Sequence, residues 1–520
     1  MMLFDNPEFV RNARIQLRRG RLIAAVIVCL AISGTIWASI MHADVDASIG
    51  NLHKAAAVFA FTLYAQVAIL LIGGGIFVLQ SVHREMEHNT FDFQRVTRLS
   101  SFELAIGKLF GAPVGAYFVT LCFVPLALAG AIGEHVPARI VAEAYVIVIL
   151  GSVAFHSLAL IISVIEGRGA GVIGILLYLA VLGATFVEPA VWSIRRVSPF
   201  AAADLLGTLP KGYPWRDEFF GVALPHFAVL VALYLALTGW FLLAVVRNLK
   251  RERALYEIYA GPQMLAFALF ASLLQLGFYS WKWTFFEGLI KLTAIGVRAT
   301  IQRHAPPFQT VEQFHLRWTV ALMAVLGLLL LRNREKIRKR AQNLGERATS
   351  LWTAAWPATY VVAGVAIVGA SLVSLIAHYR YAGEAWSLAL AVYDVVFVGV
   401  WLARDTLCIQ WLALRRARRP LASAALYFLI FYGCTATIFS ALNLYAHAHG
   451  AALTAILIPS PLFALNFANW IAGQRLWIFA LAAQCLEACL FWWLHRQRLQ
   501  EFEPEITPQE APKEMRVANA

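Results

Sequence analysis

Three ionisable side chains, His156, Asp394 and Glu487, lie inside long apolar stretches of the chain. A charged side chain at the centre of a bilayer costs at least about 2.5–3.5 kcal/mol, so each of them needs a partner or a role. They could line a path for a polar substrate or coupling ion. Alternatively, they could pair with one another, or with backbone groups, between packed helices. The sequence leaves both roles open.

Signatures of catalysis are missing elsewhere in the chain. No GxxxxGK[ST], HExxH or GxSxG motif occurs, and Gly107-Lys108 lacks the spacing and the following hydroxyl of a phosphate-binding loop. The 6 cysteines form no CxxC pair, and most of them lie in apolar stretches. We therefore expect no catalytic residue, no metal site and no cofactor in this chain, which is not expected to be an enzyme.

The composition is that of an integral membrane protein. Hydrophobic residues make up 60% of the 520 residues and charged residues only 14%, whereas soluble domains average about 45–50% and about 25%. These values exclude a soluble core, a disordered chain, a coiled coil and a disulfide-rich secreted scaffold. The predicted fold class is an all-α polytopic helix bundle.

Apolar segments long enough to cross a membrane occur throughout the chain. A transmembrane helix needs about 20 mostly apolar residues, and this length predicts about 12 spans. Segment 451–465 is better suited to a re-entrant or interfacial piece. The predicted spans are 22–42, 56–80, 108–132, 140–165, 170–192, 222–246, 263–281, 317–332, 354–377, 386–403, 424–446 and 476–494.

Lys and Arg residues indicate the orientation. They collect before the first span and after the sixth, eighth and tenth, and the last of these groups starts at Arg404. Because positive loops stay in the cytoplasm, both termini are expected there. The net charge of +13 is mostly this topological signal, so we expect no binding to nucleic acid. The polar tail 501–520 is expected to be disordered.

A short helix is predicted before the first span, over 5–20. Asp5 or Asn6 can cap it, with Pro7 in its first turn. The spacing places an apolar face opposite the arginines, as in an interfacial helix, although a plain positive anchor has the same composition. The apolar face is formed by Phe9, Val10, Ala13 and Leu17, and the polar one includes Arg11, Arg14 and Arg18.

A second cytoplasmic segment, 82–108, is predicted to form a helix, a turn and a helix. Ser100 or Ser101, followed by Glu103, has the pattern of a new helix cap. Such a rigid, charged and partly apolar projection is what another protein could push on. A solvated loop with helical propensity is the alternative.

These two segments carry a resemblance. NPEFVRNARIQLRRGR before the first span, and HREMEHNTFDFQRVTRLSSFELAIGKLFGAP after the second, are similar to the permease subunits of ABC-2 type transporters. The resemblance covers residues 5–130 and, by the order of spans, 5–250. The chain departs from the family pattern at Phe91 and Phe93, where leucines are usual, and at Asn12, where an acidic residue is common. The residues that match or occupy the ATPase-coupling segment are Arg84, Glu85, Glu87, Thr90, Phe91, Asp92, Phe93, Gly107 and Lys108.

The resemblance implies a permease subunit whose ATP and Mg²⁺ bind to a separate cytoplasmic ABC ATPase, present in two copies. That ATPase is expected to bind the 82–103 helix-turn and the N-terminal helix, and the expected direction of transport is export. The implied location is the bacterial cytoplasmic (inner) membrane. A homodimer or a heterodimer of permeases would be consistent with this resemblance. Loop 193–221 matches an external re-entrant hairpin or an interfacial belt.

The second half of the chain echoes the first, because Arg404-Asp405 follows a span much as Arg84-Glu85 does. We expect a six-span bundle over 1–255, a second membrane bundle over 256–500, and the tail 501–520. The second bundle is a divergent repeat of the first, or its similarity to the first is a coincidence of composition. The alternative function is a secondary transporter, or a multi-span membrane enzyme or scaffold, that uses Asp394 and Glu487.

Overall fold

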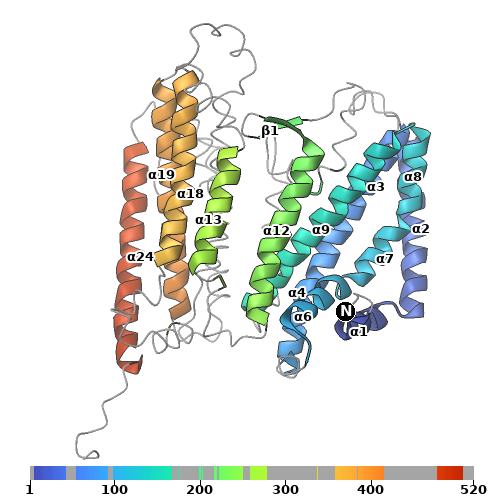
Figure 1. Ribbon diagram of the computed structural model, residues 1–520, viewed down its shortest axis with the longest axis horizontal. Helices are drawn as coiled ribbons and strands as arrows, with labels where there is room; N and C mark the ends of the chain where they lie inside the picture. The colour runs from blue at the N-terminus through green and yellow to red at the C-terminus, as the bar shows by residue number, and fades with distance from the viewer. Residues whose placement is uncertain are drawn as a thin grey trace, which may run out of the picture. The chain divides into compact units, whose positions relative to one another are not determined.

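In the residues that the computed structural model describes, the protein is almost entirely helical (Figure 1). The predicted spans 317–332 and 424–446, nearly all of 170–192, segment 451–465 and most of loop 193–221 lie outside the described residues. The described residues are 5–42, 54–91, 98–166, 175, 178, 198–200, 202, 216–219, 222–249, 258–259, 261–277, 337, 358–382, 385–414 and 477–506.

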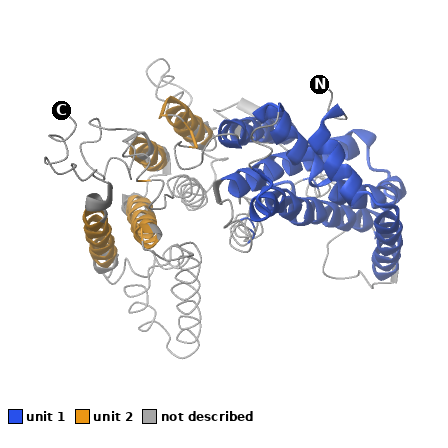
Figure 2. Ribbon diagram, turned by 90° about the horizontal axis from the view of Figure 1, so that it is seen from below, with its two compact units in different colours: residues 1–217, 223–251 blue, residues 218–222, 252–520 orange. Residues whose placement is uncertain are grey.

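The chain divides into two compact units (Figure 2). Unit 1 comprises 1–217 and 223–251, and unit 2 comprises 218–222 and 252–520. The helices of unit 1 are α1 (Pro7–Gln16), α2 (Arg19–His42), α3 (Lys54–Ala68), the π-helix η2 (Ile69–Gly74), α4 (Gly75–Glu87), α6 (Ser101–Gly111), α7 (Val114–Cys122), α8 (Val124–Gly133), α9 (Ala138–Glu166) and α12 (His226–Leu249). The described helices of unit 2 are α13 (Gly261–Gly277), α18 (Ala358–Ala382), α19 (Ala385–Leu414) and α24 (Trp477–Ile506).

Six helical segments of the described part are long and apolar enough to cross a membrane. The described part is mostly helical, as predicted, and these segments are candidate membrane spans, while the predicted total of about 12 spans includes segments outside the described residues. The six are Arg19–Ile40, Lys54–Glu87, Ser101–Gly133, Ala138–Val164, His226–Leu249 and Val395–Leu412.

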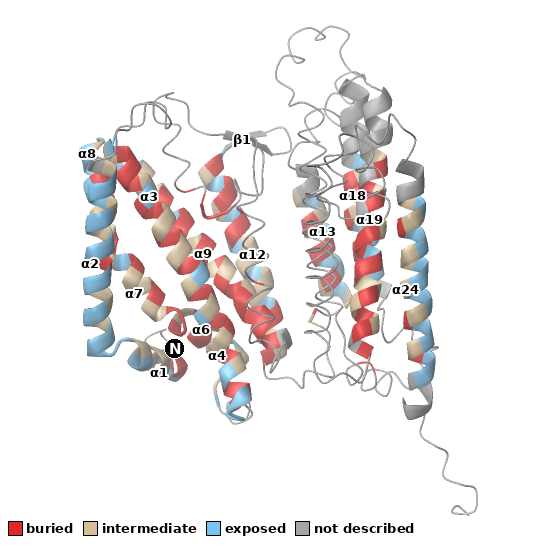
Figure 3. Ribbon diagram, turned by 180° about the vertical axis from the view of Figure 1, so that it is seen from behind, coloured by how far each residue is buried: buried red, intermediate tan, exposed pale blue. Residues whose placement is uncertain are grey.

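Unit 1 is organised around α9, which packs on α4 and α12, while α3 packs on α8. The apolar window of α9 is 67% buried within the protein, whereas that of α2 is only 6% buried (Figure 3). Because α2 is apolar on nearly every side, its exposed face is suited to lipid or to another membrane subunit rather than to water. In unit 2, α13 packs on α18, α18 on α19, and α19 on α24.

A two-stranded sheet precedes α12 and is formed by β1 (Arg216–Phe219) and β2 (Val222–Pro225). It occupies the end of the loop for which the sequence predicts a re-entrant hairpin or an interfacial belt. The rest of that loop lies outside the described residues, apart from Ser198–Phe200 and Ala202.

Candidate functional site

Helix α1 begins where the sequence predicts it. Asn6 is its N-cap, accepting hydrogen bonds from the amides of Glu8 (3.0 Å) and Phe9 (3.4 Å), and Pro7 occupies the first turn. The same Asn6 side chain donates to the carbonyl of Glu103 on α6 (2.6 Å). The helix ends at Gln16, earlier than the predicted residue 20, because the chain turns at Leu17 before α2 begins at Arg19.

The face of α1 that packs on the protein is polar. Glu8 is 5% exposed, whereas Leu17, which belongs to the predicted apolar face of an interfacial helix, is 36% exposed. Asn12 donates to the carboxylate of Glu8 (3.1 Å), and Gln16 accepts from the amide of Gly115 (2.8 Å). Glu8, Asn12 and Gln16, spaced four residues apart, therefore form one stripe along the helix.

A matching stripe of glycines, Gly107, Gly111 and Gly115, receives α1. A Cβ at Gly107 would lie 2.8 Å from the Cβ of Glu8, and one at Gly111 would lie 3.0 Å from the backbone of Phe9. A Cβ at Gly115 would lie 2.8 Å from the Gln16 amide oxygen. Both stripes repeat every four residues and run in the same direction, so α1 is in register with Gly107 and Gly111 of α6 and with Gly115 of α7. The glycines permit this close approach.

An alternating network of charges lies between α1, α4 and α6. Lys108 on α6 is fully buried and donates to Glu8 (3.1 Å) and to Glu85 on α4. Arg11 on α1 donates to the same two carboxylates, at 2.8 Å for Glu8. Burial lowers the pKa of Arg11, but the negative charges of Glu8 and Glu85 outweigh it, so that the pKa is raised and the guanidinium stays charged.

Two cations and two carboxylates thus link three helices that are distant in sequence. A buried ion pair loses about 3–5 kcal/mol when one partner is removed, because the other charge remains buried without compensation. The network therefore favours movement of α1, the last turn of α4 and the last turn of α6 as a single body. We call this body the α1–α4–α6 cluster, defined by Glu8, Arg11, Glu85 and Lys108.

The turn between α4 and α6 is closed by specific backbone bonds at both ends. Asn89 has a positive φ of 56°, and the amide of Thr90 bonds to the carbonyl of Glu85 (2.8 Å), as in a Schellman cap. At the other end, Ser100 and Glu103 form a reciprocal capping box. Ser100 is the cap of α6, as one of the two predicted candidates, whereas α4 ends at Glu87, before the predicted break near Ser100. Residues 92–97 lie outside the described residues.

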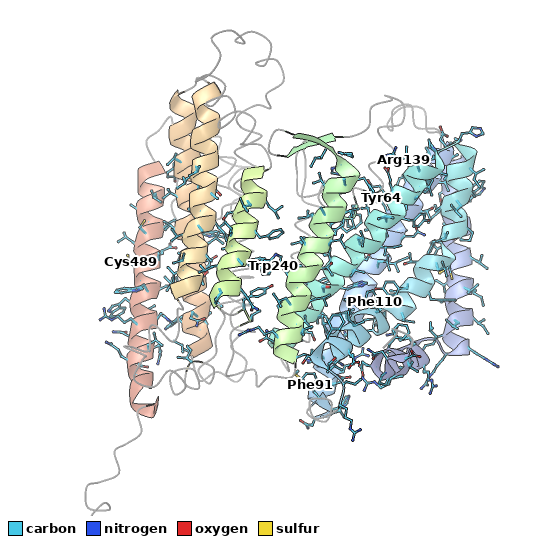
Figure 4. The ribbon with its side chains drawn as sticks, in the orientation of Figure 1. Tyr64, Phe91, Phe110, Arg139, Trp240 and Cys489 are labelled. Atoms are coloured by element: carbon cyan, nitrogen blue, oxygen red, sulfur yellow. The ribbon has the colours of Figure 1, made fainter. Side chains whose placement is uncertain are left out.

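The structure sorts the predicted coupling residues into two groups. Glu85 and Lys108 lie in the α1–α4–α6 cluster, Gly107 contacts α1, and Phe91 is buried. Figure 4 shows Phe91 at the end of unit 1 opposite to Arg139. The exposed group, which we call the turn surface, faces away from the protein, while Asp92 and Phe93 lie outside the described residues. The turn surface consists of Arg84, Glu87, His88, Thr90 and Phe102.

His156 lies in a second polar contact, inside unit 1. The π-helix η2 interrupts the helix formed with α3 and α4, so its carbonyls depart from the regular α-helical pattern of hydrogen bonds. His156 on α9 bonds the carbonyl of Leu70 (2.8 Å) and the hydroxyl of Tyr117 (3.1 Å), and Tyr178 donates to Leu71 (2.6 Å). Of the two roles predicted for His156, these contacts match pairing with backbone between packed helices.

In unit 2, Glu487 on α24 pairs with Arg404 on α19 (2.7 Å). Arg404 is fully buried, and it also bonds to Asp405 (2.7 Å) and to Gln484 (2.9 Å). Arg404 was predicted to lie in a cytoplasmic loop, and this prediction was wrong, because α19 continues to Leu414 instead of ending at residue 403. The adjacent Asp405 was the feature of the sequence that could have indicated an ion pair at Arg404. Asp394 lies in α19, but its side chain is outside the described residues.

Within the described ranges, no group of three or more His, Cys, Asp or Glu side chains is arranged to hold a metal ion. Comparisons with protein-family models, curated proteins and solved structures found no match to this chain.

Proposed function

We propose that this protein is the membrane permease subunit of an ABC-2 type transporter, driven by a separate cytoplasmic ATPase. The observation that carries the proposal is the α1–α4–α6 cluster beneath an exposed, doubly capped turn. Lys108 is fully buried in that cluster, and Glu87 on the turn is 65% exposed. A rigid projection of this kind transmits a force applied at its surface.

The proposed coupling runs from the turn surface into the membrane helices. A partner that pushes on the turn moves α4 and α6 directly, and Glu8 and Arg11 carry the motion to α1. Helix α1 is joined to α2 by two residues only. ATP-driven closure of two partner ATPases would therefore bias the helix bundle between two states.

The wider assignment belongs to the same proposal. It comprises about 12 spans, both termini in the cytoplasm, export as the direction, and the bacterial inner membrane as the location. The basic segments that flank the apolar helices support this orientation. ATP and Mg²⁺ would bind to the partner chains, and two permease bundles would come from the two halves of this chain or from a dimer.

Co-purification tests this function. The tagged full-length protein is extracted in mild detergent, and the proteins that co-elute are identified by mass spectrometry. We expect a Walker-A ATPase, recovered with the native chain and lost when the turn surface is altered by Arg84→Glu with Glu87→Lys. The matched control is Arg139→Glu with Glu143→Lys, an exposed ion pair on α9 that should leave recovery unchanged. Absence of any nucleotide-binding partner from stable protein would contradict the proposal.

The ion pair of Arg404 and Glu487 favours a second candidate, a secondary transporter. A carboxylate paired to arginine between two helices is able to exchange that partner for a proton or a cation. This candidate predicts that Glu487→Gln abolishes proton flux into proteoliposomes loaded with a pH-sensitive dye while thermal stability is retained. If no flux above that of empty liposomes occurs with the native chain, the pair is structural and this candidate fails.

A further inference from the structure

The elbow between α1 and α2 carries a row of exposed arginines. Arg14 lies in the last turn of α1, Arg18 at the bend, and Arg19 and Arg21 in the first turn of α2. All four side chains are exposed, and no acidic residue occurs anywhere in residues 9–42. Within the described residues, none of the four is held in an ion pair. The elbow is therefore a concentrated and uncompensated positive surface.

The position of this row is set by its neighbours. Glu8, Asn12 and Gln16 occupy the side of α1 that packs on the glycine stripe, so the arginines lie on the remaining surface. Helix α2 begins at Arg19 as a candidate membrane span, and α1 lies crosswise at its end (Figure 1). Residues at the end of a span lie at the depth of the lipid headgroups.

The backbone at the elbow is also open. No atom lies within 4 Å of the place where a Cβ of Gly20 would be, and the first turn of α2 contains no acidic residue. The amides of a helix's first turn favour a negative charge, and arginine forms paired hydrogen bonds to phosphate. Two exposed apolar side chains, Ile15 (48%) and Leu17 (36%), stand beside the row. They are able to contact acyl chains below a headgroup.

We propose that the α1–α2 elbow, through Arg14, Arg18 and Arg21, binds the phosphate headgroup of an anionic phospholipid in the cytoplasmic leaflet. The apolar neighbours of the row and its place at the end of α2 favour a lipid over a soluble phosphate. Because the α1–α4–α6 cluster holds α1 to α4 and α6, lipid bound at the elbow would also stabilise that cluster. This inference does not depend on the identity of any ATPase partner.

The experiment measures which lipids stay with the protein. The full-length chain is reconstituted into liposomes of phosphatidylcholine and phosphatidylglycerol, extracted, and analysed for its retained lipids by mass spectrometry. Each arginine near an anionic surface strengthens binding by about fivefold. We therefore expect the variant Arg14→Gln/Arg18→Gln/Arg21→Gln to lose about tenfold or more of the enrichment in phosphatidylglycerol.

A matched control removes three arginines elsewhere, at Arg139, Arg496 and Arg498. Two of them have partners within the protein, Arg139 with Glu143 and Arg498 with Glu501, and Arg496 lies over the ring of Trp492. The control should retain the enrichment. An equal loss of enrichment in both variants would mean that only the net charge of the protein matters, and it would overturn the proposal. Undiminished enrichment in the elbow variant would also overturn it.

Two further measurements distinguish the remaining outcomes. Thermal unfolding in phosphatidylcholine alone should be the same for the native chain and the elbow variant, because the substituted side chains are exposed. If the triple variant does not fold, the single variants Arg14→Gln and Arg18→Gln should each lose about fivefold. If inorganic phosphate displaces phosphatidylglycerol completely at millimolar concentration, the site binds a soluble anion and the lipid proposal fails.

Discussion

At the scale of single residues, two glutamates two positions apart have opposite surroundings. Glu85 is buried and contacts both Arg11 and Lys108, whereas Glu87 is 65% exposed. Both glutamates belong to the coupling segment that the resemblance implies, and the helical pattern alone does not reveal which side of α4 is covered. The distinction depends on Lys108 and Arg11, which are far away in the chain.

Replacing Glu85 should therefore destabilise the protein, and replacing Glu87 should not. Glu85→Gln leaves Lys108 buried with one carboxylate fewer, so we expect the free energy of unfolding to fall by about 3–5 kcal/mol. Glu87→Gln should change it by less than about 0.5 kcal/mol. Denaturant unfolding in detergent measures both values. Equal effects of the two substitutions would contradict the buried network.

At the scale of elements, the sequence predicted where α1 starts but not which face it buries. The cap at Asn6 and Pro7 is local and legible in the sequence. The stripe of Glu8, Asn12 and Gln16 is polar, and it faces glycines about one hundred residues later in the chain, so the apolar pattern of α1 did not reveal that this side packs on the protein. The spacing of Gly111 and Gly115 was visible in the sequence, but its partner helix was not.

Enlarging the middle of the glycine stripe should release α1. A side chain at Gly111 would meet the backbone of Phe9, which is unable to move aside without moving the helix. We expect Gly111→Val to release α1 from the protein, so that its backbone opens locally and trypsin cleaves at its arginines at least about tenfold faster in the otherwise folded protein. Gly34→Ala on α2, where no atom lies within 4 Å, is the control and should leave the cleavage rate unchanged.

The π-helix η2 is a second element whose stability depends on distant side chains. His156→Leu removes the bond to the Leu70 carbonyl, and a buried acceptor left unpaired costs about 1–3 kcal/mol. We expect faster hydrogen exchange in η2 and α4, with partial recovery in His156→Gln, whose amide is able to donate. Unchanged hydrogen exchange in the leucine variant would mean that η2 is stable without the hydrogen bond from His156, which would contradict this prediction.

At the scale of the whole molecule, composition predicted the helical class, and local patterns predicted most helix positions in the part of the chain that the structure describes. The predicted spans 56–80 and 140–165 correspond to α3–η2–α4 and α9. The extension of α19 to Leu414 and the burial of Arg404 were not predicted, because an arginine next to an aspartate in a charged segment is typical of a cytoplasmic loop. Only the packing of α24 on α19 shows that Arg404 lies between two helices and not in a loop.

The central claim is that a cytoplasmic ATPase contacts the turn surface. The most direct measurement is photo-crosslinking in living cells from a reactive amino acid placed at His88 or Thr90, which are exposed. The control is the same amino acid at Arg139, which lies at the opposite end of unit 1 from Phe91 (Figure 4). The account predicts a crosslink from the turn to a protein with a Walker-A motif, and none from Arg139. Efficient incorporation without any such crosslink, or an equal crosslink from both sites, would contradict it.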